Sequence, residues 1–92
     1  MNRRYLLLET KHRDEVEKII LEYIGVLGWA KSSPLFIKTP NKNFLILSIN
    51  RKSLEDIRAA LEISGGKIKI LKVSGTLRGV ERWTILKEQD IK

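Results

Sequence analysis

Two amphipathic helical segments, each set between short apolar runs of strand type, constrain most strongly what this chain can fold into. Apolar side chains recur at helical spacing in residues 14–27 and again in residues 53–64. The runs around them are typical of strands and cover residues 4–9, 34–39, 43–49 and 67–73. The order strand, helix, strand, strand, helix, strand predicts an α+β fold of the split βαβ type, ferredoxin-like and RNA-recognition-motif-like. We expect one domain over residues 1–92, with a four-stranded antiparallel sheet and both helices on one face.

Turn and capping residues predict where the elements begin and end. We expect Gly25 and Gly28 to end the first helix and Gly65-Gly66 to end the second. Ser53 predicts the cap of the second helix, with Asp56 completing a box-like arrangement. Pro and Asn in residues 40–43 indicate a hairpin between the second and third strands.

Three segments carry less regular patterns. Residues 4–9 are apolar on both faces, which predicts a central strand. The apolar phase changes between Ile70 and Leu71, which indicates a bulge or burial on both faces. Residues 77–90 fit either a helix or a strand, and we favour a short C-terminal helix.

Acidic residues are absent from two long stretches, residues 28–52 and 65–80, although both contain lysine and arginine. The net charge is +7. Because acids cluster on the predicted helices, one side of the molecule is expected to be cationic and to bind a polyanion. The alternative is a solvated edge strand whose lysines prevent aggregation. The expected phosphate-contacting residues are Lys31, Lys38, Lys42, Arg51, Lys52, Lys67, Lys69, Lys72, Arg78 and Arg82.

The strands also contain more apolar residues than one covered sheet face requires. If the helices cover only one face, apolar side chains on the other face stay exposed and mark a site for a protein partner. The residues expected there, or else their neighbours of opposite phase, are Leu45, Leu47, Ile49, Leu71 and Val73.

The sequence contains no set of residues that points to catalysis by the chain itself. It has no cysteine and one histidine, His12, so we expect no metal site and no catalytic residue. The aromatic run that stacks bases in RNA-recognition motifs is missing, so RNA contact would be dominated by phosphates. No apolar run is long enough to cross a membrane, and we expect a cytoplasmic protein.

Several blocks of the sequence together carry a resemblance to a known family. They begin with Arg4-Tyr5-Leu6-Leu7-Leu8-Glu9 and continue with Gly25-Val26-Leu27-Gly28 and Pro34-Leu35-Phe36-Ile37-Lys38. The most specific blocks run from Asn50 to Leu61 and from Val73 to Arg78. In this order, and over nearly the whole chain, the blocks resemble the archaeal ribonuclease P protein component 2 family.

The resemblance implies a subunit of the ribonucleoprotein that removes the 5′ leader of precursor tRNA. In that particle the ribonuclease P RNA is the catalyst and binds magnesium, while the protein holds no cofactor. The implied protein partner is the barrel-like component 3, with two copies of each chain and so a homodimer within a heterotetramer. The implied RNA contacts are Arg4, Lys38, Arg51, Lys52, Arg58 and Arg78.

Two alternatives stay open from the sequence. Arg58 can instead pair with Glu55 or Glu62 on its own helix. The whole chain can instead be a regulatory or protein-interaction module with the same topology, because this fold hosts many functions.

Overall fold

The structure, a computed structural model, describes residues 2–10, 12–39 and 43–90, and for residues 84–90 it describes the backbone alone. The elements in chain order are β1 (Arg3–Glu9), α1 (Arg13–Lys31), β2 (Leu35–Lys38), β3 (Leu45–Asn50), the 3-10 turn η1 (Arg51–Ser53), α2 (Leu54–Ile63), β4 (Lys69–Ser74) and α3 (Leu77–Asp90). No helix in the described ranges is long and apolar enough to span a bilayer.

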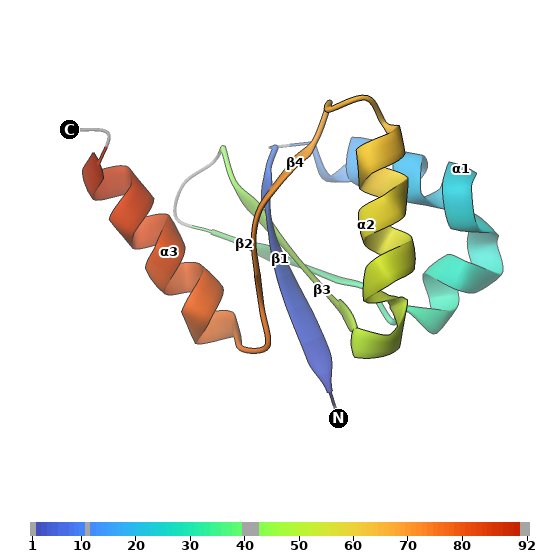
Figure 1. Ribbon diagram of the computed structural model, residues 1–92, viewed down its shortest axis with the longest axis horizontal. Coiled ribbons are helices and arrows are strands. Elements are labelled where there is room, and N and C mark those ends of the chain that lie inside the picture. Colours follow the sequence, from blue (N-terminus) through green and yellow to red (C-terminus); the bar gives the residue numbers. More distant parts are fainter. Residues whose placement is uncertain (1, 11, 40–42, 91–92) are drawn as a thin grey trace.

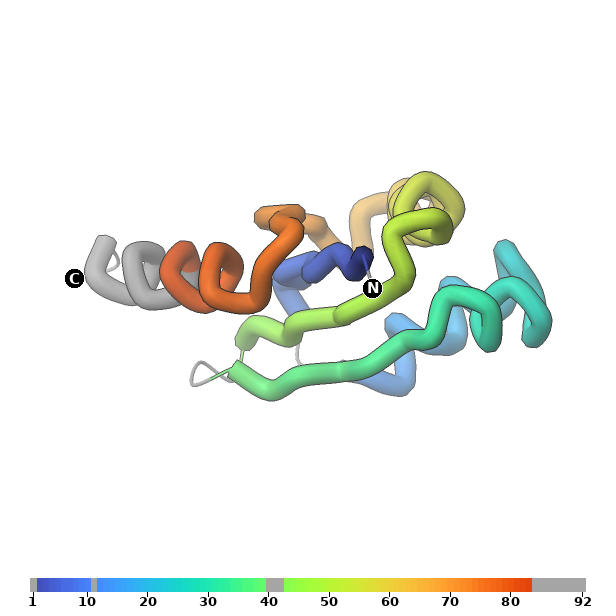
Figure 2. The backbone as a smooth tube through the Cα atoms, turned by 90° about the horizontal axis from the view of Figure 1, so that it is seen from below, coloured from blue at the N-terminus to red at the C-terminus, as the bar shows by residue number. Residues whose placement is uncertain are grey.

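The strands form one antiparallel sheet in the order β2-β3-β1-β4. This arrangement confirms the predicted α+β fold and its split βαβ connections. Helices α1 and α2 lie on one side of the sheet and α3 lies on the other (Figures 1 and 2). The sheet is therefore the middle of three layers.

Strand β1 is buried on both faces, as its run of leucines predicted. Leu6, Leu7 and Leu8 each have no exposed surface. Leu6 and Leu8 belong to the core under α1 and α2, whereas Leu7 belongs to a second core with Val80 of α3. Alternating side chains of one strand thus hold the two helical layers to the sheet.

The second core overturns the prediction of an exposed sheet face. Leu45, Leu47 and Ile49 are at most 7 % exposed and pack against α1 and α2. Leu71 and Val73 are half-buried and point to opposite faces, Leu71 toward α3 and Val73 toward α2. The prediction was wrong because Leu45, Leu47 and Ile49 lie on the face that α1 and α2 cover, and their neighbours of opposite phase, Phe44 and Ile46, are buried in the second core with Val80 of α3.

The first helix continues past its predicted end. Gly25 has φ 77° and ψ 175°, which breaks the helical geometry, yet the chain resumes a helix as far as Lys31. Gly28 does not end the helix either, since the helix runs on to Lys31. Gly25 therefore makes a kink, and Gly28 leaves room for the Ile24 side chain, whose Cβ would lie 3.0 Å from a Cβ on Gly28.

The start of α2 differs from the predicted cap. Ser53 makes no side-chain capping bond, and its φ of −94° and ψ of 0° place it in the helical region. The Asn50 side chain instead accepts a hydrogen bond from the backbone N–H of Lys52, at 3.1 Å. Because η1 precedes α2 directly, the capping position moves back to Asn50.

Strand β4 contains the predicted irregularity, and the C-terminal segment is the favoured helix. Leu7 pairs with Lys72 and Leu8 pairs with Ile70, so Leu71 has no partner on β1. This bulge explains the phase change in the sequence. β4 begins at Lys69, so Lys67 lies before the strand rather than on it.

We predict that Leu47→Ala lowers the free energy of unfolding by about 2–5 kcal/mol, because it leaves a cavity in the core. Leu27→Ala is the matched control, since Leu27 is 76 % exposed, and its effect should stay within about 0.5 kcal/mol. Urea unfolding followed by circular dichroism measures both. Equal effects would contradict the burial of β3.

Candidate nucleic-acid interface

Antiparallel pairing brings several chain segments to one end of the sheet. The beginning of β1 pairs with the end of β3, since Arg3 is opposite Asn50. The end of β4 lies on the other side of β1, where Ser74 is opposite Tyr5. Two backbone hydrogen bonds join further segments to this end. The N–H of Asn50 donates to the C=O of Ser32 at 2.8 Å, and the N–H of Arg51 donates to the C=O of Asn2 at 3.1 Å.

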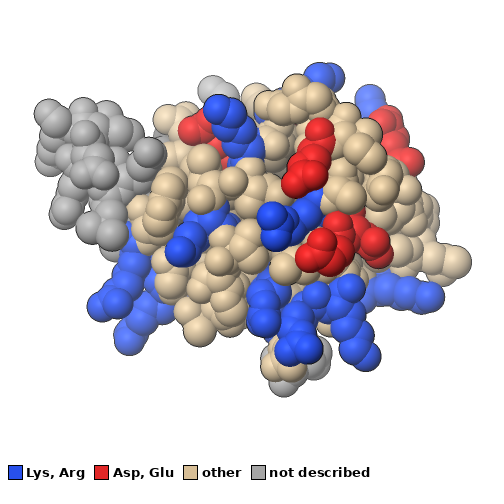
Figure 3. All heavy atoms as spheres, in the orientation of Figure 1, with Lys and Arg blue, Asp and Glu red and all other residues tan. Residues whose placement is uncertain are grey.

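Five of the twelve cations predicted to contact RNA lie at this end. We call them the basic rim, which consists of Arg4, Lys31, Arg51, Lys52 and Arg78. In Figure 3, basic side chains gather along the lower edge of the molecule, where η1, the start of β1 and the β4–α3 turn lie. The acids visible on this face lie higher, mainly toward the side of α1 and α2 (Figure 3). Glu55 and Asp56, in the first turn of α2, are the acids nearest to the rim in the chain.

Arg3 also lies at this end, but its guanidinium is used inside the protein. Its Nε donates to Ser48 Oγ at 2.7 Å, and its Nη2 donates to the carbonyls of Ser33 at 2.6 Å and Ser48 at 2.9 Å. Ser48 is 1 % exposed, so Arg3 satisfies a buried hydroxyl and ties the α1–β2 loop to β3. Sequence reasoning missed this role, although a serine within the apolar run of β3 was a signal that a polar partner was needed.

Arg4 points to the opposite face and toward the β4–α3 turn. Its Nη1 donates to the carbonyl of Arg3 at 2.9 Å. A Cβ on Gly75 would lie 3.4 Å from the same nitrogen, so the guanidinium rests beside that glycine. A guanidinium has five N–H donors, and one donor suffices for the bond to Arg3.

The β4–α3 turn forms a capped helix start beside Arg4. Thr76 Oγ1 accepts a hydrogen bond from the Gly79 N–H, and Ser74 Oγ accepts one from the Thr76 N–H, both at 3.2 Å. A Cβ on Gly79 would lie 2.5 Å from Ser74 Oγ, so this packing requires glycine. The positive end of the α3 dipole and the side chain of Arg78 therefore meet at the rim.

The other cations predicted for RNA contact do not join the rim. Lys38 is opposite Leu45, and Lys69 is opposite Glu9, which places both at the far end of the sheet. Lys72 lies in the middle of β4, and Arg58 lies on the exposed side of α2. Lys67 precedes β4, and Lys42 lies outside the described residues. Arg82 is exposed on α3, one turn after Arg78. The predicted set is thus divided between several surfaces.

A second exposed feature is apolar and lies on the helical layer. We call it the apolar patch, and it consists of Tyr23, Val26, Leu27 and Ile63, which are 49–76 % exposed. Tyr23 and Ile63 line a shallow hollow of about 340 Å³ between α1 and α2. Val26 and Leu27 follow the kink at Gly25. The helical spacing of apolar residues 14–27 did not reveal this patch, because spacing alone does not show which side chains stay exposed.

The described residues offer no metal site. Among them, no three His, Cys, Asp or Glu side chains are grouped so that they could ligate an ion. The arrangement is suited to binding through charge and apolar contact.

No family model matches the chain, but two curated archaeal proteins do. Ribonuclease P protein component 2 of Thermococcus gammatolerans is 41 % identical over 81 residues, which covers 76 % of this chain and 68 % of that protein. Ribonuclease P protein component 2 of Thermococcus kodakarensis is 37 % identical with the same coverage.

We predict that Arg3→Met lowers the free energy of unfolding by about 1–3 kcal/mol, because the buried Ser48 hydroxyl loses its partner. Arg51→Met is the control, since Arg51 is an exposed rim residue. It should change the free energy of unfolding by no more than about 0.5 kcal/mol. Chemical denaturation of the two variants separates a structural arginine from a surface one. A larger loss for Arg51→Met would overturn this assignment.

Proposed function

We propose that this chain, which belongs to the ribonuclease P protein component 2 family, supports the catalytic RNA of ribonuclease P by neutralising its phosphates with the basic rim. A ribonuclease P protein subunit takes part in processing precursor tRNA. The observation that carries the proposed mechanism is the meeting of cations from β1, η1, α1 and α3 at one end of the sheet.

Phosphates brought close together in a folded RNA repel one another, and each lysine or arginine that contacts them releases condensed counterions. In this proposal Arg51 and Lys52 contact phosphates from the capped turn η1. Arg4 and Arg78 bind beside the start of α3, where backbone N–H groups also favour an anion. The capped turn and helix hold these groups in place before RNA binds, which lowers the entropic cost of binding.

The chemistry of cleavage belongs to the RNA in this proposal, and magnesium is held by the RNA. The grouped charges of the rim would stabilise one folded shape of the RNA over its alternatives. The proposal does not use the remaining predicted contacts, which stay predictions: Lys38, Lys42, Arg58, Lys67, Lys69, Lys72 and Arg82.

The apolar patch is the proposed docking site for the barrel-like component 3. Exposed apolar groups on a protein of this size favour a protein partner. The patch lies on the helical layer, whereas the rim lies at one end of the sheet, so both partners can bind at once. The alternative is a regulatory module that binds a protein partner and no RNA. In the tests below, such a module would bind its partner through the apolar patch and would bind no RNA through the rim.

For RNA binding, we predict different effects from two triple variants with the same change in charge. Arg51→Gln, Lys52→Gln and Arg78→Gln together should lower the slope of log affinity against log salt by about 2, since each lost contact contributes roughly 0.7–0.9. The control is the triple variant Lys38→Gln, Lys67→Gln and Lys69→Gln at the far end of the sheet, which should change the slope much less. Filter binding to an archaeal ribonuclease P RNA at several salt concentrations measures both slopes. Equal slopes for both variants would show that net charge alone matters.

For the protein partner, we predict that Val26→Asp with Leu27→Asp abolishes association with component 3. Both side chains are about three-quarters exposed, so the fold should survive. Leu35→Asp, at a side chain that is 57 % exposed on β2, is the control and should associate normally. Calorimetric titration with purified component 3 measures the association of each variant. Normal binding by the double variant would move the docking site elsewhere.

A further inference from the structure

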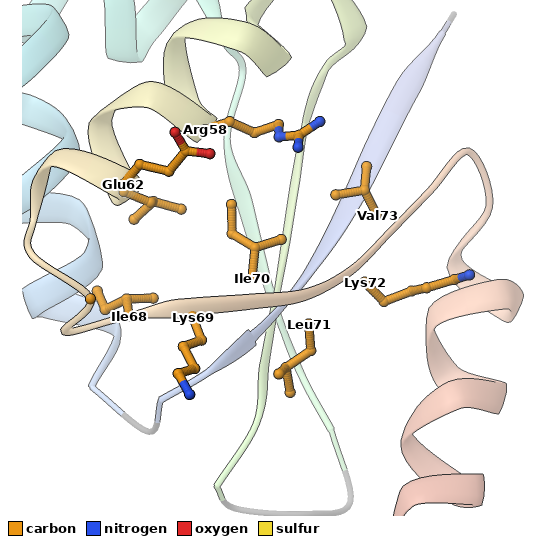
Figure 4. Close-up of a pocket in the computed structure, with 10 residues that line it drawn as sticks. Arg58, Glu62, Ile68, Lys69, Ile70, Leu71, Lys72 and Val73 are labelled. Carbon is orange, nitrogen blue, oxygen red and sulfur yellow. The ribbon is translucent and has the colours of Figure 1, made fainter.

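Strand β4 forms an open edge of the sheet, and a groove lies beside it. Its one strand neighbour is β1, so its outer side is unpaired within the described sheet. The groove, of about 510 Å³, lies between β4 and α2. Figure 4 shows Ile70 and Val73 pointing from β4 toward α2, while Lys69 and Leu71 point the other way.

The outer edge of β4 offers backbone groups for another strand. In an antiparallel pair alternate residues bond to the neighbour, so about half of the six residues of β4 direct their N–H and C=O groups outward. Six residues in a strand span about 20 Å, which is enough to hold one extended peptide segment. The bulge at Leu71 interrupts a long regular ladder, so it favours a short segment over a long flat strand.

The floor of the groove is apolar and incompletely covered. Ile70 and Val73 are half-buried members of the main core, and Leu61 of α2 closes the floor between them. An edge strand that needs protection only against aggregation usually carries charged side chains on its exposed faces. On β4, the face toward α2 carries apolar side chains instead. Every second side chain of an added strand would therefore meet an apolar surface.

The charges around the groove are mainly positive. Arg58 from α2 and both Lys69 and Lys72 from β4 line it, against Glu62. In Figure 4 the guanidinium of Arg58 extends along the groove toward Val73, away from the carboxylate of Glu62. An added strand whose apolar side chains meet Ile70 and Val73 directs its other side chains to the face of β4 that carries Lys69 and Lys72, so carboxylates are favoured at those positions.

Two other occupants fit less well. A second copy of β4 would bring Lys69 and Lys72 against the same lysines, which costs free energy. An RNA strand would meet an apolar floor whose lining residues include no aromatic side chain for stacking bases.

We infer that β4 and the groove beside α2 bind an extended segment of a partner protein, in which apolar side chains alternate with carboxylates. The segment joins the sheet as an additional strand on β4. Its apolar side chains cover Ile70 and Val73, and its carboxylates, on the opposite face of the added strand, pair with Lys69 and Lys72. This site is separate from the basic rim and from the apolar patch, and it does not depend on the proposed function.

The test uses the full chain, labelled with ¹⁵N, and a peptide of about eight residues in which valine and glutamate alternate, long enough to cover β4. We expect amide shifts and slower hydrogen exchange in β4 and along the facing side of α2. The same peptide with a methylated backbone nitrogen at alternate residues cannot complete the ladder, and it should not bind. Equal binding by the methylated peptide, or shifts confined to α1, would overturn strand addition.

Charge variants test the proposed pairing. Lys69→Glu with Lys72→Glu should weaken the binding of the glutamate peptide about tenfold, and it should strengthen the binding of a peptide in which lysine replaces glutamate. The triple rim variant serves as the control and should bind the glutamate peptide like the unchanged protein. Tighter binding of the lysine peptide to the unchanged protein would overturn the charge assignment. Shifts at β4 caused by a short RNA, or dimer formation in the absence of peptide, would assign the groove to RNA or to a second copy.

Discussion

The burial of β1 on both faces is the constraint on which the other features depend. Three successive leucines, Leu6 to Leu8, have no exposed surface, and they join a core on each side of the sheet. A strand of this kind must lie in the centre, with neighbours on both edges and helices on both faces. Because β3 and β4 run antiparallel to it, their C-terminal ends meet its beginning. Residues far apart in the sequence thereby come together in the basic rim.

Neighbouring arginines in this strand have different tasks because successive side chains point to opposite faces. Arg3 bonds to Ser48 and Ser33, so its charge stabilises the protein itself. Arg4 turns to the face that meets Gly75 and contributes to the rim. Grouping like charges at one end costs free energy in the isolated chain, and a polyanion removes that cost when it binds. This is the physical reason to connect the rim with RNA.

Local patterns in the sequence were enough to predict most of the fold. The helical stripes, the central strand and the bulge of β4 each follow from the spacing of apolar residues, which depends on nearby neighbours. The cap at Asn50 was missed because a 3-10 turn before α2 changes which residue stands at the helix start. The kink at Gly25 was predicted as an end, since glycine marks a change of geometry without showing whether the helix resumes.

The surfaces were harder to predict, because they depend on the packing of elements far apart in the sequence. Leu47 was expected to be exposed, and its burial depends on how α1 and α2 lie on the sheet. The cations were predicted as one group, but strand direction separates Lys38 and Lys69 from Arg51. Charge runs in a sequence indicate a class of partner. The sheet topology decides which of those charges can act together.

Mapping the RNA contact on the free chain by NMR tests the central claim most directly. When an archaeal ribonuclease P RNA fragment is titrated into the ¹⁵N-labelled protein, we predict that the largest amide shifts fall at residues 50–53 and 74–78. These segments are η1 with its cap and the β4–α3 turn. Shifts of equal size around Lys38 and Lys69, at the opposite end of the sheet, would contradict the account.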